Sequence, residues 1–306
     1  MNNKTAVILI NWNSFPYVAG CISSFSEKDP SLYDLIVVDN ASSDLSLKML
    51  QDRFTDLIFL SSPVNAGFAG GCNIGLQYAI DHGYTYSLLL NADTFVQPGF
   101  LSVLVEYMDQ HPRAGAIQPK IYYNYDRRIL WNGGSRYNRW LGITYSSGFK
   151  HQDGPQQNTI QPVDWITGCA FLVKNSVLQE VGLFDPAFFM YYEDVDLSFR
   201  IRKHGYQLIY HPLSVIYHIA GVSTKKTVKD HEGWVLPLVH YYNIRNRIWV
   251  LKKYTKPLFA PTVVIFSIFY GTMILLYFAI RLRFKKFRAA FRGIADGLQK
   301  RGALNT

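Results

Sequence analysis

Three short apolar runs, each ending in polar side chains, constrain the fold of this chain more than any other feature. They read VILIN at residues 7–11, LIVVDN at 35–40 and LLLNAD at 88–93. Runs of this length rich in Val, Ile and Leu predict strands of a parallel sheet that are buried on both faces. Helix-length segments at 16–27, 43–53 and 70–82 alternate with them. This alternation predicts a doubly wound α/β domain with a mostly parallel sheet.

The polar residues that end these runs are Asn11, Asp39, Asn91 and Asp93. In doubly wound sheets, ligands bind beyond the carboxyl ends of the strands. Each residue alone is better explained as a turn residue or a helix cap than as a ligand contact. Because all of them are expected at the same edge of the sheet, the set predicts a ligand site.

A glycine-rich segment, NAGFAGGCNIGL at residues 65–76, follows the second run. It lacks the G-x-G-x-x-G spacing and does not occupy the first strand-to-helix turn, so it is no dinucleotide fingerprint. We interpret it as a loop entering a helix, with small residues that allow close approach of a nucleotide or a neighbouring strand. A purely structural role for Gly75 is an equal alternative.

Composition limits the class of protein and its compartment. The chain has 306 residues and 49% hydrophobic content, enough for one large domain and an appendage. Cys21, Cys72 and Cys169 form no C-x-x-C pair and stand in apolar or glycine-rich contexts, which indicates reduced, buried thiols. The N-terminal apolar run is short and has no cleavage site, so we expect no signal peptide and a cytoplasmic location.

The net charge of +9 is concentrated in the C-terminal tail. Residues 245–306 contain 13 Lys and Arg but one Asp or Glu, whereas residues 1–244 contain 18 and 21. A basic tail suits nucleic acid or an anionic membrane surface. The high apolar content of this tail favours the membrane, and nucleic acid is not expected as a partner.

Within the tail, residues 258–280 form 23 uncharged, mostly apolar positions, long enough to cross a bilayer. Basic residues flank this run on both sides, and the positive-inside rule resists export of the more basic C-terminal flank. Apolar residues then recur at three- and four-residue steps, predicting an amphipathic interfacial helix. This stripe consists of Phe284, Phe287, Phe291, Ile294 and Leu298.

We therefore divide the chain into a catalytic domain, residues 1–250, and a membrane-associating tail, residues 251–306. The tail is expected to lie on or dip into the cytoplasmic leaflet without carrying the C-terminus across. The alternative is that it packs on the catalytic domain or on a second subunit of a homodimer.

Residues 122–162 show weak periodicity and are interpreted as an excursion from the sheet, the kind of long loop that often forms a lid or binding wall. Trp131 and Trp140 in this stretch suit stacking on a sugar ring. Order then resumes as a predicted strand at residues 165–173 and a short helix ending near Gly182.

Three acids, Glu193, Asp194 and Asp196, follow an aromatic run in the stretch YYEDVDLSFR. Asp196 and Arg200 have the i, i+4 spacing of an ordinary exposed helix ion pair. This ion pair explains Asp196 but does not explain why Glu193 and Asp194 stand beside it.

Five motifs together resemble the inverting family 2 glycosyltransferases of the GT-A fold, over about residues 4–250. They are VVDNASSD, NAGFAGGCNIGL, LLLNAD, GCAFLVKNSVLQEVGLFD and YYEDVDLSFRIRKHGY. The chain is most similar to the bacterial rhamnosyltransferases that build surface polysaccharides. The resemblance implies a nucleotide-sugar donor, with dTDP-rhamnose favoured, and a lipid-linked oligosaccharide acceptor.

The resemblance also implies roles for individual residues. Asp39 would contact the base or ribose of the donor, with the other nucleotide-site positions being Asn11, Asn65, Gly67, Asn73 and Asn91. The family's acidic-x-Asp motif corresponds to residues 91–93, so Asp93 would bind magnesium or manganese. His218, at the end of the apolar run LSVIYH, would complete this metal site. Asn91 is neutral where the family has an acid, which predicts weak metal binding.

The paired acids would supply the chemistry. Asp194 corresponds to the general base that removes a proton from the acceptor hydroxyl. Glu193 would bind acceptor hydroxyls or orient the base, and Trp131 and Trp140 would contact the acceptor. Two alternatives stay open: transfer of galactofuranose or a hexose from a UDP donor, and a sugar-nucleotide-binding protein with a degenerate site, suggested by Asn91.

Overall fold

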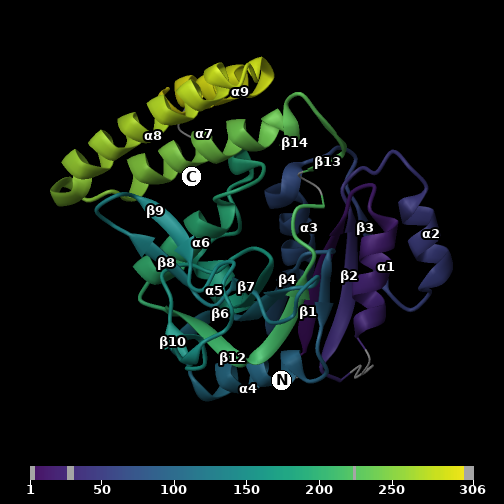
Figure 1. Ribbon diagram of the computed structural model, residues 1–306. Helices are drawn as coiled ribbons and strands as arrows, with labels where there is room; N and C mark the ends of the chain where they lie inside the picture. Colours follow the sequence, from purple (N-terminus) through teal and green to yellow (C-terminus); the bar gives the residue numbers. More distant parts are fainter. Residues whose placement is uncertain (1–3, 26–30, 223–224, 300–306) are drawn as a thin grey trace. The chain divides into compact units, whose positions relative to one another are not determined.

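The computed structural model describes residues 4–25, 31–222 and 225–299 (Figure 1). The chain forms two compact units. Unit 1 contains residues up to 136, 145–189 and 193–220, and unit 2 contains residues 137–144, 190–192 and those from 221 onward. The boundary expected near residue 250 falls inside helix α7 (Pro237–Tyr254), and this whole helix groups with the C-terminal segment. The division therefore differs from the expected one, because residues 137–144, 190–192 and 221–250 also belong to unit 2.

Unit 1 is built on one mixed sheet. In the described residues this sheet has ten strands, with the order β10-β12-β6-β11-β4-β1-β2-β3, while β5 pairs with β12 and β7 with β6. The strands are β1 (Thr5–Asn11), β2 (Tyr33–Asp39), β3 (Ile58–Ser61), β4 (Tyr86–Leu90), β5 (Thr94–Val96), β6 (Ala114–Tyr123), β7 (Leu130–Asn132), β10 (Gln161–Pro162), β11 (Ala170–Lys174) and β12 (Gln207–His218). The three apolar runs form β1, β2 and β4, which pair in parallel as predicted.

Helices cover both faces of this sheet. They are α1 (Phe15–Ser24), α2 (Ser46–Arg53), α3 (Gly67–Asp81), α4 (Phe100–Gln110), α5 (Asn175–Val181) and α6 (Glu193–Lys203). Val7 and Leu9 of β1 pack in one core cluster with α1 and α4, while Ala6 and Ile8 pack in another with α3 and α5. Alternate residues of a strand point to opposite faces, so both faces of β1 are buried. The prediction of strands buried on both faces is confirmed.

The helix predictions hold except at the ends. The first was expected to run to residue 27, but residues 26–27 lie outside the described part of the chain. The third begins at Gly67, three residues earlier than expected. A Cβ on Gly75 would lie 2.5 Å from the Ile8 side chain, so this glycine allows α3 to pack closely on β1. Its role is structural.

Two expectations about the middle of the chain were wrong. The strand predicted at 165–173 begins only at Ala170, because the preceding residues form a turn that serves the site described below. The excursion is not a simple loop. It contains β7, the pair β8 (Ser135–Asn138) and β9 (Ile143–Ser146), a 3-10 turn (Pro155–Gln157) and β10.

Buried polar side chains order part of this excursion. Gln118 donates to Asn132, Asn132 donates to Ser135, and Ser135 donates back to Gln118, with distances of 3.0 to 3.1 Å, and all three are fully buried. Buried polar groups need such partners. Because amides rather than apolar residues hold this region together, its hydrophobic periodicity is weak.

Unit 2 contains a small sheet and three long helices, which lie side by side in Figure 1. Its elements are β13 (Lys225–Asp230), β14 (Gly233–Val235), α7, a 3-10 turn (Pro257–Phe259), α8 (Ala260–Ile280) and α9 (Phe284–Leu298). Ile244 of α7, Phe278 of α8 and Ala290 of α9 form its core.

The apolar stripe predicted on α9 divides into two rows. Phe287 and Ile294 pack against the core of unit 2. Phe284, Phe291 and Leu298 are exposed, by 66%, 58% and 65%. The helix therefore packs on its neighbours with one row and presents the other outward.

Candidate active site

The turn after β2 closes around Asp39. Asn11 is fully buried, and its Nδ2 donates to Asp39 Oδ1 at 2.7 Å and to Ser46 Oγ at 2.9 Å. Ser42 Oγ donates to the same carboxylate oxygen at 2.6 Å, and Ser42 N donates to Oδ2 at 3.1 Å. The sequence prediction placed Asn11 and Asp39 together but missed Ser42 and Ser46. The geometry gives Asn11 the task of orienting Asp39.

The glycine-rich segment is tied to the same strand end. Asn40 donates to Asn65 Oδ1 at 3.2 Å and to the Gly67 carbonyl at 2.9 Å. Gly67 has φ of +72°, and a Cβ there would lie 2.4 Å from the Phe189 carbonyl oxygen. A side chain is therefore excluded by both conformation and space. Asn40, which sequence reasoning passed over, stands directly after Asp39 in the motif VVDNASSD.

Asn73, on the next turns of α3, has a local role. Its Nδ2 donates to the Phe184 carbonyl at 2.8 Å, and its Oδ1 accepts from Phe184 N at 3.0 Å. Both polar ends of the amide are thus used to hold the loop before α6. This arrangement assigns Asn73 to the support of that loop rather than to a ligand.

Strand pairing brings Asp93 and His218 together across 125 residues. In the β5 and β12 pairing, His218 lies opposite Thr94, the residue that follows Asp93. His218 Nε2 lies 3.1 Å from Asp93 Oδ1. The predicted metal ligands are therefore neighbours.

Trp131 packs beside this pair. Its ring centroid lies 4.5 Å from that of His218, with the planes nearly perpendicular. His218 is 4% exposed, and its Nδ1 has no hydrogen-bond partner in the described part of the chain. Trp131 thus packs directly against the imidazole of the Asp93 and His218 pair.

The paired acids begin helix α6. Asp194 Oδ2 accepts from Gly168 N at 2.8 Å, and Oδ1 accepts from Val195 N at 2.8 Å. The residue after Gly168, Cys169, accepts a hydrogen bond from Asn91 N at 2.9 Å. The turn before β11 therefore joins the acid pair to the Asn91 to Asp93 segment. This bonding is the reason that the strand expected at Trp165 starts later.

Burial separates the two acids in proton affinity. Burial raises the pKa of Asp194 to about 6, although backbone N–H donors at Gly168 and Val195 oppose the shift by stabilising its carboxylate. The pKa of Glu193 is raised well above its usual range, first by burial and then by the charge of Asp194. Glu193 is 4% exposed, and its Oε2 has no partner among the described residues. Asp194 is therefore the member of the pair that ionises first, and it is a suitable proton acceptor near neutral pH.

Asp196 forms the predicted ion pair with Arg200, but not on an exposed face of the helix. Arg200 Nε lies 2.9 Å from its Oδ2, and the Asp196 side chain is fully buried rather than exposed. The Arg200 guanidinium also donates to the carbonyls of Val181, Gly182 and Leu183. This ion pair fixes α6 to the end of α5.

Trp140 lies in unit 2, where its ring meets Phe259 edge-on at 4.8 Å and its carbonyl accepts from Thr262 Oγ1 at 2.7 Å. It is 54% exposed. The structure thus groups Trp131 with the Asp93 and His218 pair, and Trp140 with the start of α8.

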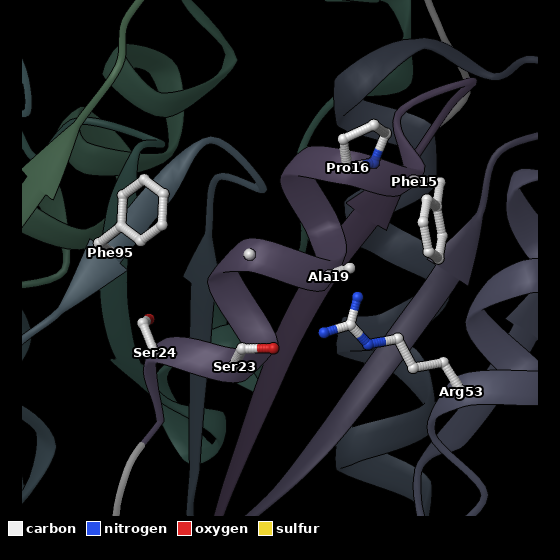
Figure 2. Close-up of a pocket in the computed structure, with 8 residues that line it drawn as sticks. Phe15, Pro16, Ala19, Ser23, Ser24, Arg53 and Phe95 are labelled. Atoms are coloured by element: carbon white, nitrogen blue, oxygen red, sulfur yellow. The ribbon is translucent and has the colours of Figure 1, made fainter.

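A separate hollow of about 550 Å³ lies against α1 (Figure 2). It is lined by Phe15, Pro16, Ala19, Gly20, Ser23, Ser24, Arg53 and Phe95. This lining contains no carboxylate or imidazole and none of the predicted site residues. The candidate active site therefore lies at the sheet edge that carries Asp39 and Asp93, to which the turn before β11 joins Asp194 of α6.

The residues present fit a divalent cation shared with a ligand. Among the described residues, no group of three or more His, Cys, Asp and Glu could hold a metal ion. Asp93 and His218 supply two donors 3.1 Å apart. Magnesium commonly uses one or two carboxylates and completes its shell with substrate phosphates and water. A two-donor protein site suits that mode of binding.

The α/β sheet with acidic strand ends and paired carboxylates is the arrangement that the resemblance to GT-A glycosyltransferases implied. The family model for glycosyl transferase family 2 matches residues 6–182, more than half of the chain, and the chain belongs to this family. The family-level resemblance drawn from the motifs is confirmed.

Two curated relatives are rhamnosyltransferases. The N-acetylglucosaminyl-diphospho-decaprenol L-rhamnosyltransferase of Mycobacterium tuberculosis is 25% identical over 250 residues, covering 76% of this chain and 81% of that protein. The rhamnosyltransferase WbbL of Escherichia coli K12 is 25% identical over 252 residues, covering 79% and 93%. The chain is thus similar to rhamnosyltransferases over most of their length.

Solved structures agree on the fold. GalNAc-T7 with UDP, GalNAc and Mn2+ is 17% identical with a TM-score of 0.57, and the alignment covers 70% of this chain but only 43% of that one. The mannosyltransferase PcManGT from Pyrobaculum calidifontis with GDP-Man and Mn2+ is 15% identical with a TM-score of 0.55, covering 96% and 86%. At these identities the likeness establishes the fold alone.

Proposed function

We propose that this glycosyltransferase transfers L-rhamnose from dTDP-rhamnose to a lipid-linked saccharide, with inversion at the anomeric carbon. The observation that carries the proposal is the environment of Asp194, a half-buried residue whose carboxylate has a raised pKa and accepts from two backbone N–H groups. Asp194 accepts the proton of the acceptor hydroxyl while that oxygen bonds to the anomeric carbon. The bond from this carbon to the diphosphate breaks, and the nucleoside diphosphate leaves.

Glu193 supports this step indirectly, as a buried neighbour of Asp194. It is buried beside Asp194, and a neutral Glu193 leaves Asp194 as the single charge of the pair. Contact of Glu193 with acceptor hydroxyls, the first of its two predicted roles, is disfavoured by its 4% exposure. Orientation of Asp194 is the role that its burial supports.

Asp93 and His218 would hold a magnesium or manganese ion, and a cation of this kind stabilises negative charge on the leaving diphosphate. Mn2+ in two solved structures of the same fold supports this assignment. Asp39, held by Asn11 and Ser42, would contact the nucleoside, with Asn65 and Asn91 at the same sheet edge. Asn91 brings no charge, so we expect weak affinity for the metal.

The two rhamnosyltransferase relatives support rhamnose as the donor sugar. The Haloferax volcanii hexosyltransferase Agl10, 26% identical over 210 residues, keeps a hexose donor as the second candidate. Calorimetric titration with dTDP and with UDP tests the donor, and a transfer assay in magnesium and then in excess chelator tests the metal. We expect tighter binding of dTDP and a loss of activity in chelator. Preference for UDP would overturn the rhamnose assignment, and full activity in chelator would overturn the metal assignment.

We place the enzyme at the cytoplasmic face of the membrane, where a lipid-linked acceptor is met. Among the described residues, one helical stretch, Pro257–Ile280, is long and apolar enough to cross a membrane, with a mean hydropathy of 2.3 in its most apolar window. Its exposed large side chains include Leu258, Val264, Ile265, Ile268, Phe269, Met273, Leu276, Tyr277 and Ile280. Together with the outer row of α9 they would face lipid.

The packing of α8 on α7 favours a helix that lies in the membrane surface over one that spans it. Val263 and Phe278, near opposite ends of α8, are each 3% exposed. Arg247 of α7 stacks under Tyr270, 5.3 Å from its ring, and donates to Ser267 at 3.3 Å. A span would carry this guanidinium to the middle of the hydrocarbon layer, at a cost of several kcal/mol.

Membrane docking is tested on the full chain, since removal of α9 would also expose the core of unit 2. We expect the triple change of Phe284, Phe291 and Leu298 to Ser to reduce binding to vesicles containing anionic lipid, because these exposed side chains would enter the interface. Unchanged vesicle binding would overturn this surface. A concentration-dependent dimer that the triple change dissolves would assign the surface to a second copy instead.

A further inference from the structure

The residues directly before the catalytic pair have an unusual backbone. Phe189, Tyr191 and Tyr192 all have positive φ, between 65° and 68°. For residues with a Cβ, the left-handed region costs roughly 1–2 kcal/mol each. Such strain persists only when surrounding groups hold it in place. The segment ends at Glu193, where α6 begins.

The strained segment is fastened on its N-terminal side by α3. The Phe189 carbonyl accepts from Ala69 N at 3.1 Å. Gly67 lies so close to Phe189 that no side chain is possible there. Contacts with α3 within unit 1 therefore fix Phe189, the residue at the N-terminal end of the strained segment.

The next residues are held by one buried amide of α7. Asn246 is fully buried, and its Nδ2 donates to the carbonyls of Met190 and Tyr191, at 2.8 Å each. Residues 190–192 group with α7 in unit 2, whereas Phe189 and Glu193 belong to unit 1. Asn246 thus bonds the short stretch of unit 2 that leads directly into the catalytic helix.

The Asn246 amide is itself oriented. Its Oδ1 accepts from Arg245 Nε at 2.8 Å. The Arg245 guanidinium lies 4.1 Å from the Trp249 ring and 4.7 Å from the Tyr242 ring. Cation–π stacking of this kind restricts the guanidinium. The donor face of Asn246 is consequently directed at the two carbonyls.

We propose that Asn246 is a positioning residue for the transfer reaction: by holding the left-handed segment before α6, it sets the place of Asp194. The inference rests on the proposed function, in which Asp194 is the base. Asp194, in the first turn of α6, accepts from Val195 N of that turn and from Gly168 N of the turn before β11. A displacement of about 1 Å in a reacting group can lower a rate by about 10²-fold. Loss of the Asn246 amide therefore acts on turnover and leaves the nucleotide site at Asp39 intact.

The test compares Asn246→Ala with Asn243→Ala, a matched change one turn earlier on α7. Asn243 donates to the Val239 carbonyl of its own helix at 2.9 Å, so its loss should not reach the segment before α6. We expect Asn246→Ala to lower kcat by about 30- to 100-fold, with donor KM and dTDP affinity within about twofold of wild type. Asn243→Ala should stay within about twofold in all three.

Asn246→Gln supplies the conservative variant. Its amide retains donors on a longer side chain, so we expect partial recovery, to within about tenfold of the wild-type kcat. It also carries the test if the alanine variant does not fold. Wild-type kcat in both variants would overturn the proposal. A parallel loss of kcat, dTDP affinity and melting temperature would also overturn it, since that pattern indicates a purely structural residue.

Asp194→Asn, assayed alongside, separates this inference from the proposed function. If Asp194→Asn is active, the base assignment fails and the inference fails with it. If Asp194→Asn is inactive and the Asn246 variants are normal, only the inference fails.

Discussion

Asp194 and Asp196 stand two residues apart on α6 and have opposite electrostatic settings. Asp196 is fully buried, and Arg200 neutralises it at 2.9 Å. Asp194 is held by the backbone N–H groups of Gly168 and Val195 and has a raised pKa. A buried charge is tolerated when it is paired, whereas a carboxylate without a cation keeps a high proton affinity. One helix turn therefore carries an ion-paired acid and the acid that we propose as the base.

The difference also separates stability from function. Ionised Asp194 destabilises the fold, because its folded-state pKa lies above the unfolded value of 3.8. The folded state binds the proton more tightly, so this group lowers stability as pH rises through the range between the two pKa values. Asp196 with Arg200 instead anchors α6. Changes at the two positions should therefore affect different measurements.

The largest effect is expected from Asp194→Asn, which removes the proposed base. Loss of a general base typically costs about 10²- to 10⁴-fold in rate, so we expect kcat to fall by that amount with dTDP affinity retained. Stability at pH 8 should be equal to or above that of wild type, because a poorly solvated charge is gone. Steady-state kinetics, calorimetry and thermal melts provide the three measurements. Near wild-type turnover would refute the assignment.

Asp196→Asn should show the reverse pattern. Removing one partner of a buried ion pair leaves the other charge uncompensated, and we expect a loss of about 3 kcal/mol in the free energy of unfolding. The matched control is Asp164→Asn, because Asp164 pairs with Arg202 of the same helix at 3.0 Å on a partly exposed surface. That change should cost less than about 1 kcal/mol. Equal losses in urea denaturation would contradict the contrast.

The pH dependence of turnover should report Asp194 and not Asp196. Protonated Asp194 cannot accept the hydroxyl proton, so kcat should fall below the pKa of about 6, by about tenfold per pH unit. Glu193→Gln should leave this limb in place, because burial and the charge of Asp194 raise the pKa of Glu193 well above its usual range and Asp194 ionises first. A pH profile that is flat between pH 5 and 8 in the wild-type enzyme would argue against Asp194 as the base.

The smallest effect is expected at the proposed metal site, where the Asp93 carboxylate lies beside the His218 imidazole. Asn91→Asp adds a second negative charge at the proposed metal site, and we expect the manganese concentration for half-maximal activity to fall several-fold. An added charge near a cation site is worth on the order of 1 kcal/mol when solvent screens it. Metal titration of activity measures this change. Weaker metal dependence on Asn91→Asp would place the cation elsewhere.

The sequence alone was sufficient to predict the sheet and much of the site. Apolar runs at β1, β2 and β4 are local patterns, and their polar ends share one edge because parallel strands are equivalent there. Asn11, Asp39, Asn91 and Asp93 could therefore be proposed as one ligand site without a structure, whereas Asp194 on α6 was proposed only from the motif resemblance. The motif resemblance then identified the family to which the chain belongs.

Other features depended on contacts between distant residues, which a local pattern cannot encode. The meeting of His218 with Asp93 required the register of β5 on β12, and the late start of β11 followed from the hydrogen bond of Gly168 to Asp194. The burial of Asp196 likewise depended on packing, since an i, i+4 pair looks the same on an exposed helix. The sequence determined which side chains are available for chemistry. Tertiary structure decided their proton affinity and their partners, because burial and long-range hydrogen bonds arise only when the elements pack.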